Sequence, residues 1–125
     1  MAKPPNIQAV VPTPESIKAE NPADYAERGY LYFSQKKFDQ ASEDFRHVVG
    51  LDASNLEAWY GLGLALKGAA QNTQAIDAFE HVLNLLGNIE DHQRANVLGR
   101  LVKGHINQLK TGDWNLEKEV WKSVK

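Results

Sequence analysis

Apolar side chains recur at helical spacing in four consecutive stretches of the middle of the chain. The positions are Tyr25, Gly29, Tyr32 and Phe33; then Ala41, Phe45, Val48, Val49 and Leu51; then Trp59, Leu62, Gly63 and Leu66; and finally Ala75, Phe79, Val82, Leu83 and Leu85. Spacings of three and four residues place such side chains on one face of a helix. The pattern therefore predicts four amphipathic helices in succession.

Polar residues between these stretches indicate where each helix begins. Asn21, Pro22 and Asp24 form the strongest start signal, because Asn accepts a hydrogen bond from a free amide, Pro suits the first helical position and an acid favours the positive end of the helix dipole. The expected caps are, in chain order, Asn21, Asp39, Asn55 and Asn72-Thr73, with Gly87 as a left-handed residue at the end of the fourth helix.

The four predicted helices form two copies of one unit, because the pattern repeats after 34 residues. Superposing residues 22–55 on residues 56–89 matches equivalent positions along both helices. The matched pairs are Tyr25 with Trp59, Gly29 with Gly63, Tyr32 with Leu66, Ala41 with Ala75, Phe45 with Phe79, His47 with His81, Val48 with Val82 and Leu51 with Leu85. A fixed period of this length is typical of stacked helix-turn-helix units.

The order of residue types in each unit resembles the tetratricopeptide repeat. An aromatic residue is followed by glycine, then by an aromatic residue or leucine, and later by alanine and phenylalanine. Residues 51–63 are similar to the junction between repeats of that family, whereas Arg28 and Ala53 depart from its preferred residues. The resemblance implies an all-α fold, a short αα superhelix of two helix-turn-helix repeats followed by C-terminal capping helices.

Small residues are expected to let the two helices of each unit approach closely. Gly29 facing Ala41, and Gly63 facing Ala75, would supply the space, since helices pack closely only where the facing side chains are small. The larger aromatic side chains would then fill the gaps between neighbouring helices.

The third unit loses the pattern after residue 89. Gln93, Val97 and Asp113 stand where the repeat has an aromatic residue, glycine and phenylalanine. A long amphipathic helix is predicted instead from about Glu90 to Leu109, with an apolar face made by Val97, Leu98, Leu101, Val102, Ile106 and Leu109. Because the end of a repeat stack exposes an apolar flank, we interpret this helix as a cap.

Three regions follow from these boundaries. Residues 1–21 are rich in proline and are interpreted as a flexible arm, with a short helical turn that Thr13 and Pro14 could start. Residues 22–110 form the repeat domain, with repeats 22–55 and 56–89 and a degenerate capping unit from residue 90. Thr111-Gly112-Asp113 ends the capping helix, and residues 111–125 contain a last amphipathic helix.

Charge and composition exclude several classes of function. Lys and Arg number 14 against 16 Asp and Glu, so the net charge of −2 disfavours nucleic-acid binding. Cysteine is absent, which removes disulfides, thiolate nucleophiles and cysteine zinc sites. The chain has no stretch apolar enough for a secretory signal or for membrane insertion, and we expect a cytoplasmic protein.

The residue types that carry chemistry are scattered. His47 and His81 are expected at partly exposed structural positions, His92 in a charged first helical turn and His105 at the boundary of an apolar face. The glycines between residues 61 and 68 lack the spacing of a phosphate-binding loop. We therefore expect no catalysis, no metal and no cofactor.

The resemblance also implies where a partner would bind. In the family, the first helix of each repeat lines a concave groove, and the matching positions here are largely aromatic and aliphatic. The expected groove residues are Tyr30, Phe33, Glu57, Tyr60, Leu64, Lys67, Arg94 and Leu98. Family members that clamp a C-terminal carboxylate use Lys, Asn and Arg, and here those positions hold Ala26, Tyr30, Gly61, Asp91 and Ala95.

Trp114 and Trp121 share one helical face seven residues apart and leave three alternatives open. They could dock within the chain, pair with a second copy or contact a partner. The leading hypothesis is a non-catalytic adaptor or scaffold that binds a protein or peptide partner in the groove. The alternatives are a self-association module that forms a homodimer and a regulatory domain of an enzyme complex.

Overall fold

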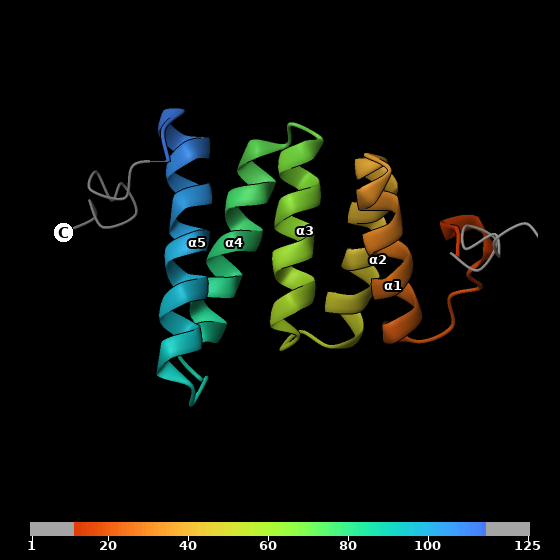
Figure 1. Ribbon diagram of the computed structural model, residues 1–125, viewed down its shortest axis with the longest axis horizontal. Helices are drawn as coiled ribbons and strands as arrows, with labels where there is room; N and C mark the ends of the chain where they lie inside the picture. The colour runs from red at the N-terminus through yellow and green to blue at the C-terminus, as the bar shows by residue number, and fades with distance from the viewer. Residues whose placement is uncertain (1–11, 115–125) are drawn as a thin grey trace, which may run out of the picture.

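The computed structural model describes residues 12–114, and within that range it contains helices and no strand. In chain order they are the 3-10 helix η2 (Pro14–Ser16) and the α-helices α1 (Pro22–Ser34), α2 (Phe38–Leu51), α3 (Leu56–Gly68), α4 (Asn72–Leu86) and α5 (His92–Thr111). Consecutive α-helices pack on one another, and in Figure 1 they follow from α5 through α4 and α3 to α2 and α1, which overlap in this view. The predicted all-α fold of two helix-turn-helix repeats and a terminal helix is confirmed.

Helices α1, α3 and α5 begin in the same way. Asn21, Asn55 and Asp91 each accept a hydrogen bond from the backbone amide three residues later, at 2.9, 3.0 and 3.0 Å. Each bond satisfies one of the amides that the first turn of a helix leaves free. The caps predicted at Asn21 and Asn55 are confirmed, and Asp91 marks α5 as the first helix of a third unit.

Helices α2 and α4 begin without a side-chain cap, so the caps predicted at Asp39 and Asn72-Thr73 were wrong. The preceding turns instead contain Lys36 and Ala70 in the left-handed conformation, each with a φ of 61°. In both turns the next amide donates to a carbonyl in the last turn of the preceding helix, at 2.9 Å. This backbone arrangement closes the end of α1 and of α3 and directs the chain into the second helix.

The end of α4 also differs from the prediction. Gly87 has a φ of −63°, so the left-handed cap expected there was wrong. The chain continues to turn in the right-handed sense, and the amides of Asn88 and Ile89 donate to the carbonyls of Leu85 and Leu86 at 3.1 and 3.2 Å. A left-handed residue is therefore not required to close this helix.

The core of each repeat is one buried phenylalanine ring placed against glycine. Phe45 and Phe79 have no exposed surface. A Cβ atom on Gly63 would lie 2.6 Å from the ring of Phe79, and one on Gly29 would lie 3.1 Å from the ring of Phe45. The nearest neighbours of these glycines are thus aromatic rings of the second helix, rather than Ala41 and Ala75 as predicted.

Helix α5 is the last described helix and packs on α4 as one uninterrupted helix. Val102 and Ile106 are buried, at 0% and 1% exposure, within the core cluster that includes Leu86 of α4. Val97 and Leu101 belong to the predicted apolar face but are 65% and 39% exposed, because the buried face is narrower than expected. The predicted break is confirmed at Gly112, which has a φ of 77° and ends the helix.

The described part of the N-terminal arm packs on the first repeat. Pro14 of η2 is buried, and the Glu15 carboxylate lies 3.1 Å from the Lys37 ammonium. The Ile17 carbonyl accepts a 3.5 Å hydrogen bond from Arg28. Residues 1–11 and the C-terminal helix expected beyond Trp114 lie outside the described residues. In the described range, no helix is long and apolar enough to cross a membrane.

Candidate functional site

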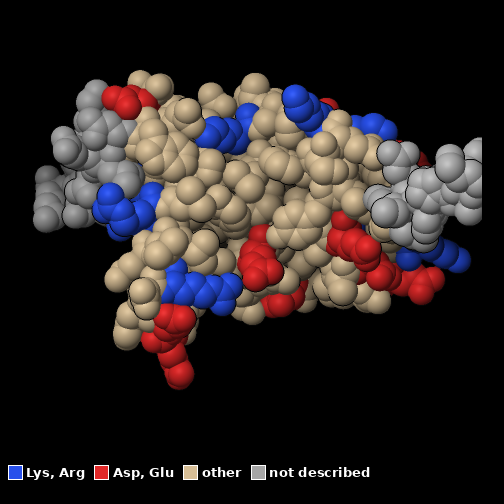
Figure 2. All heavy atoms as spheres, in the orientation of Figure 1, with Lys and Arg blue, Asp and Glu red and all other residues tan. Residues whose placement is uncertain are grey.

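Helices α1, α3 and α5 together form a groove of about 410 Å³, which we call the first-helix groove. Its lining residues are Tyr30, Leu56, Glu57, Tyr60, Arg94, Val97 and Leu98. Figure 2 shows a band of uncharged side chains along this face, with basic side chains above and below it and acidic side chains below it, one of them close to the middle of the view. The structure thus brings Tyr30, Glu57, Tyr60, Arg94 and Leu98, all predicted from the sequence, to one site.

Two tyrosines form the aromatic part of the groove. Tyr30 is 47% exposed, and its ring lies edge-on to the buried Phe45 at 5.0 Å between centroids. Burial raises the pKa of the Tyr30 hydroxyl, with a smaller contribution from the charge of Glu57. Burial likewise raises the pKa of Tyr60. Both hydroxyls therefore stay protonated at neutral pH and can donate a hydrogen bond to a bound peptide.

One ion pair connects two of the helices that line the groove. Arg94 on α5 lies 3.5 Å from the carboxylate of Glu57 on α3. The two side chains are 56% and 72% exposed, so their attraction is screened by water and contributes at most about 1 kcal/mol. The pair can open at small cost, which leaves both charges available to a ligand.

A polar network joins the far end of α3 to α5. The Lys67 ammonium lies 2.9 Å from His105 Nδ1 and also donates to Gln108. Because an ammonium can only donate, Nδ1 accepts and the neutral ring carries its proton on Nε2, which lies 3.2 Å from the Tyr60 hydroxyl. Burial, with the charge of Lys67, lowers the pKa of His105 from 6.5 to about 4. The ring is therefore neutral at physiological pH.

Three of the predicted groove residues do not line the groove. Phe33 packs edge-on against Phe38 at 5.4 Å, Leu64 packs against the core and Lys67 is held by α5. Two residues that sequence reasoning missed, Leu56 and Val97, line it instead. Each is adjacent in sequence to a predicted groove residue.

Trp114 contacts its own chain. Its ring lies against Gly104 and edge-on to His105, with 4.7 Å between the ring centroids. The Lys67 ammonium stands 5.5 Å above the same ring, within the range of a cation–π interaction. Trp114 thus makes contacts within the chain and keeps 37% of its surface exposed, and Trp121 lies outside the described residues.

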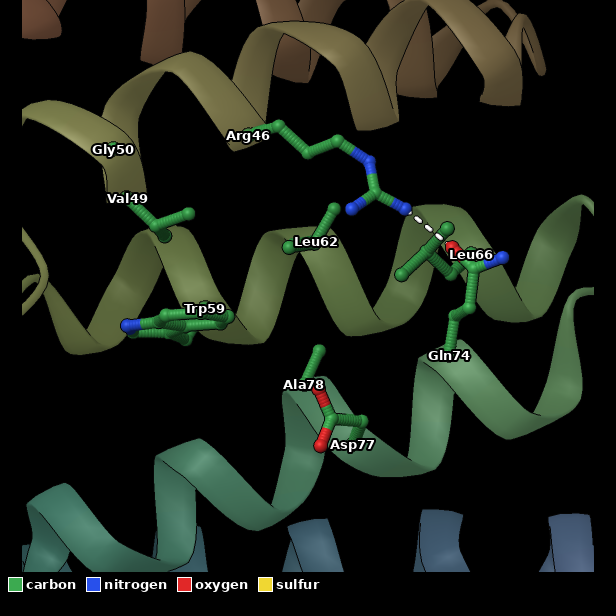
Figure 3. A pocket seen from close by; sticks show the side chains of 9 residues that line it. All are labelled: Arg46, Val49, Gly50, Trp59, Leu62, Leu66, Gln74, Asp77 and Ala78. Carbon is green, nitrogen blue, oxygen red and sulfur yellow. Dashed lines mark hydrogen bonds between the residues drawn. The ribbon is translucent and has the colours of Figure 1, made fainter.

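A second hollow of about 400 Å³ lies between α2, α3 and α4 (Figure 3). Arg46 of α2 donates to Gln74 of α4 at one end of the hollow, and Trp59 lies at the other end. The Trp59 ring stacks on His81 at 4.0 Å and its indole nitrogen donates to the Ala53 carbonyl at 2.8 Å. These contacts fix the junction between the repeats and give the tryptophan a structural role.

His47 and His81 make equivalent ring contacts in the two repeats. His47 stacks on Tyr25 with 4.6 Å between ring centroids, as His81 does on Trp59 one repeat later. Both rings thus join the second helix of a repeat to the first. Among residues 12–114, no group of three or more His, Cys, Asp and Glu side chains is placed to hold a metal ion.

Comparison with known proteins agrees with this architecture. A family model described as TPR repeat matches residues 29–68, and a second, described as tetratricopeptide repeat, matches residues 56–85. These ranges cover most of both helix pairs and the junction between them. No curated protein and no solved structure gives a significant match. The 34-residue period, the stacked helix pairs and these two matches identify residues 29–85 as tetratricopeptide repeats.

Proposed function

We propose that the chain is a non-catalytic adaptor that binds an apolar segment of a partner protein in the first-helix groove. Tetratricopeptide repeats generally mediate interactions between proteins, and the groove supplies a surface of suitable chemistry. The observation that carries the proposal is the partly exposed Tyr30 beside Tyr60 and Val97. Exposed aromatic and aliphatic side chains in one concavity are typical of a binding surface.

The chemistry of the lining favours a segment with spaced apolar anchors. The tyrosine rings, Leu56, Val97 and Leu98 offer apolar contact, while the tyrosine hydroxyls can donate to a peptide carbonyl. The Glu57–Arg94 pair at the rim can accept one charge of either sign from the partner. A clamp for a C-terminal carboxylate is disfavoured, because Gly61 and Asp91 stand at two of the positions where the family uses cationic or amide side chains.

Displayed peptides selected on the full chain would test this proposal. A selected peptide is titrated against wild type and against Tyr30→Ala and Val97→Ser, which alter exposed groove residues and should leave the fold intact. Each variant should weaken binding about 10-fold or more, as expected for an anchor residue. Leu51→Ala is the matched control, since Leu51 is 64% exposed but lies outside the groove. Equal affinity for all four proteins would rule out the groove.

A further inference from the structure

Lys67 of α3 determines which ring nitrogen of His105 carries the proton. Its ammonium lies 2.9 Å from His105 Nδ1, and an ammonium has N–H donors and no acceptor. A proton on Nδ1 would therefore face another donor across this contact. The neutral imidazole avoids that conflict only as the tautomer with its proton on Nε2.

The His105 ring is held in this orientation by its neighbours. It stacks on Phe79 with 4.9 Å between ring centroids and 6° between planes, and Trp114 lies edge-on to it at 4.7 Å. A half-turn of the ring would place carbon atoms against Lys67 and Tyr60, and both hydrogen bonds would be lost. Packing and hydrogen bonding thus select one orientation and one tautomer.

This tautomer determines how the Tyr60 hydroxyl can bond. His105 Nε2 lies 3.2 Å from the hydroxyl oxygen, so the Nε2–H group donates and Tyr60 accepts. A hydroxyl that accepts at its oxygen keeps its own hydrogen for another partner. Among residues 12–114 Tyr60 makes no further side-chain hydrogen bond, and it lines the first-helix groove. The hydroxyl hydrogen is therefore available to an occupant of the groove.

Tyr30, the other tyrosine of the groove, is not constrained in this way. Within the described part of the chain its hydroxyl takes part in no hydrogen bond, so it can donate to an occupant or accept from one. In Tyr60 one acceptor position is already taken by His105. The bond from His105, which Lys67 polarises, also strengthens the Tyr60 hydroxyl as a donor.

We propose that Lys67 and His105 are positioning residues that direct the Tyr60 hydroxyl to donate a hydrogen bond to an acceptor oxygen of the bound segment. This inference rests on the function proposed above, because it concerns the same groove. The acceptor is a main-chain carbonyl or a side-chain carboxylate, which accept from a hydroxyl in the same way. A segment that presents only an N–H group here is disfavoured, since it would compete with His105 for the Tyr60 oxygen.

The tautomer is measured first in the free protein, where no partner is needed. The ¹⁵N shifts of the His105 ring at neutral pH distinguish a protonated from an unprotonated nitrogen. Nε2 should be protonated, and Nδ1 should have the shift of a nitrogen that accepts a hydrogen bond. Lys67→Arg, which can also only donate, should keep this pattern, whereas Lys67→Met should change the Nδ1 shift.

Lys110→Met is the matched control for these shifts. It removes the same charge from an exposed position on the helix that carries His105, and it should leave both ring nitrogens unchanged. A proton on Nδ1 in the wild-type protein would overturn the proposal. An Nδ1 shift that Lys67→Met does not change would overturn it as well.

Binding then tests whether these contacts act on the groove. A peptide from the displayed library is titrated against wild type, Tyr60→Phe, Lys67→Met and the double variant. Tyr60→Phe keeps the ring and should weaken binding about 5-fold or more, as expected for the loss of one hydrogen bond. Lys67→Met should weaken binding less, and it should have no further effect in the Tyr60→Phe background, because it acts through that hydroxyl.

Tyr30→Phe supplies the control pair. Its hydroxyl is not bonded to His105, so the effects of Tyr30→Phe and Lys67→Met on the binding free energy should add. Additive effects of Tyr60→Phe and Lys67→Met would overturn the proposal. If Tyr30→Ala and Val97→Ser weaken binding but Tyr60→Phe does not, only this inference fails. Full affinity of all three variants would overturn the groove as well.

Changes in the peptide identify the acceptor. Each acidic side chain is replaced by alanine, and each main-chain amide is replaced by an ester or methylated on its nitrogen, one position at a time. An ester weakens the carbonyl as an acceptor, whereas N-methylation removes only a donor. One alanine or one ester replacement should abolish the difference between wild type and Tyr60→Phe, which assigns the bond to a carboxylate or to a carbonyl. If N-methylation at the same position also abolished that difference, Tyr60 would accept from the peptide and the proposal would be wrong.

Discussion

Arg28 on α1 forms a two-pronged ion pair with Asp44 on α2. Arg28 Nε lies 2.9 Å from one carboxylate oxygen and Nη2 lies 2.8 Å from the other. The Asp44 side chain is only 4% exposed. One repeat later the equivalent positions hold Leu62 and Ala78, both buried. The departure of Arg28 from the family pattern is therefore matched by a change in its neighbour.

Arg28→Leu is expected to lower the free energy of unfolding by about 2–4 kcal/mol, because Asp44 would remain buried without its cation. The double variant Arg28→Leu, Asp44→Ala reproduces the pair of the second repeat and should lie within about 1 kcal/mol of wild type. Urea unfolding measures both. A double variant as unstable as the single one would show that the two repeats do not tolerate the same pair.

Ala70→Gly is expected to stabilise the protein by about 0.5–1 kcal/mol. Ala70 has a φ of 61°, a conformation that costs any residue with a Cβ atom but not glycine. Ala69→Gly is the matched control, since Ala69 has a φ of −81° and should lose stability on the same change. Thermal unfolding of the two variants checks the opposite signs.

Two glycines on neighbouring helices should respond differently to the same substitution. Gly63→Ala would place a Cβ atom 2.6 Å from Phe79 and should destabilise the protein by about 1–3 kcal/mol. Gly50→Ala meets no atom within 4 Å and should gain about 0.5–1 kcal/mol of helix propensity. The midpoints of denaturant unfolding measure both changes in stability. Equal effects of Gly63→Ala and Gly50→Ala would contradict the packing of Phe79 against Gly63.

The stability of the fold should depend on pH through His105. Its pKa is lowered from 6.5 to about 4 on folding, so the unfolded chain binds the proton more readily. The contribution of His105 is therefore complete above about pH 6.5 and is lost as the pH falls toward 4, by about 2 kcal/mol after screening by solvent is discounted.

His105→Phe should remove this part of the profile while keeping a ring on Phe79, which stacks on His105 at 4.9 Å. The difference between the unfolding free energies of wild type and variant is measured from pH 8 to pH 4, roughly the range over which an imidazole titrates. A difference that stays constant across this range would show that the pKa of His105 is the same in the folded and unfolded states.

The sequence predicted the features that depend on local signals. The period, the caps at Asn21 and Asn55 and the break at Gly112 each depend on a few neighbouring residues. The starts of α2 and α4 were misassigned because polar residues at Asp39 and Asn72 looked like caps, while the backbone turn before them already closes the preceding helix. Pattern alone does not reveal a left-handed alanine.

The groove was predicted only in part, because the position of α5, which supplies Arg94, Val97 and Leu98, depends on contacts between residues far apart in the sequence. Tyr60 meets His105 across 45 residues, and Lys67 meets Gln108 across 41. These contacts exist because α5 continues straight to Thr111 instead of folding into a second helix pair. By its position in the repeat Lys67 is expected to line the groove. In the structure its ammonium instead contacts His105 and Gln108 of α5, and Lys67 is not among the residues that line the groove.

The ion pair between Arg28 and Asp44 also bears on how two near-copies of one unit fold correctly. During folding, α1 could take the place of α3 on α4, or α3 could take the place of α1 on α2, since the apolar positions are equivalent in both repeats. The first mispairing would bury Arg28 against Ala78, and the second would bury Asp44 against Leu62, each charge without its counterion. A single polar pair thus gives the first repeat an identity that the second lacks, and it makes the exchanged assemblies unstable.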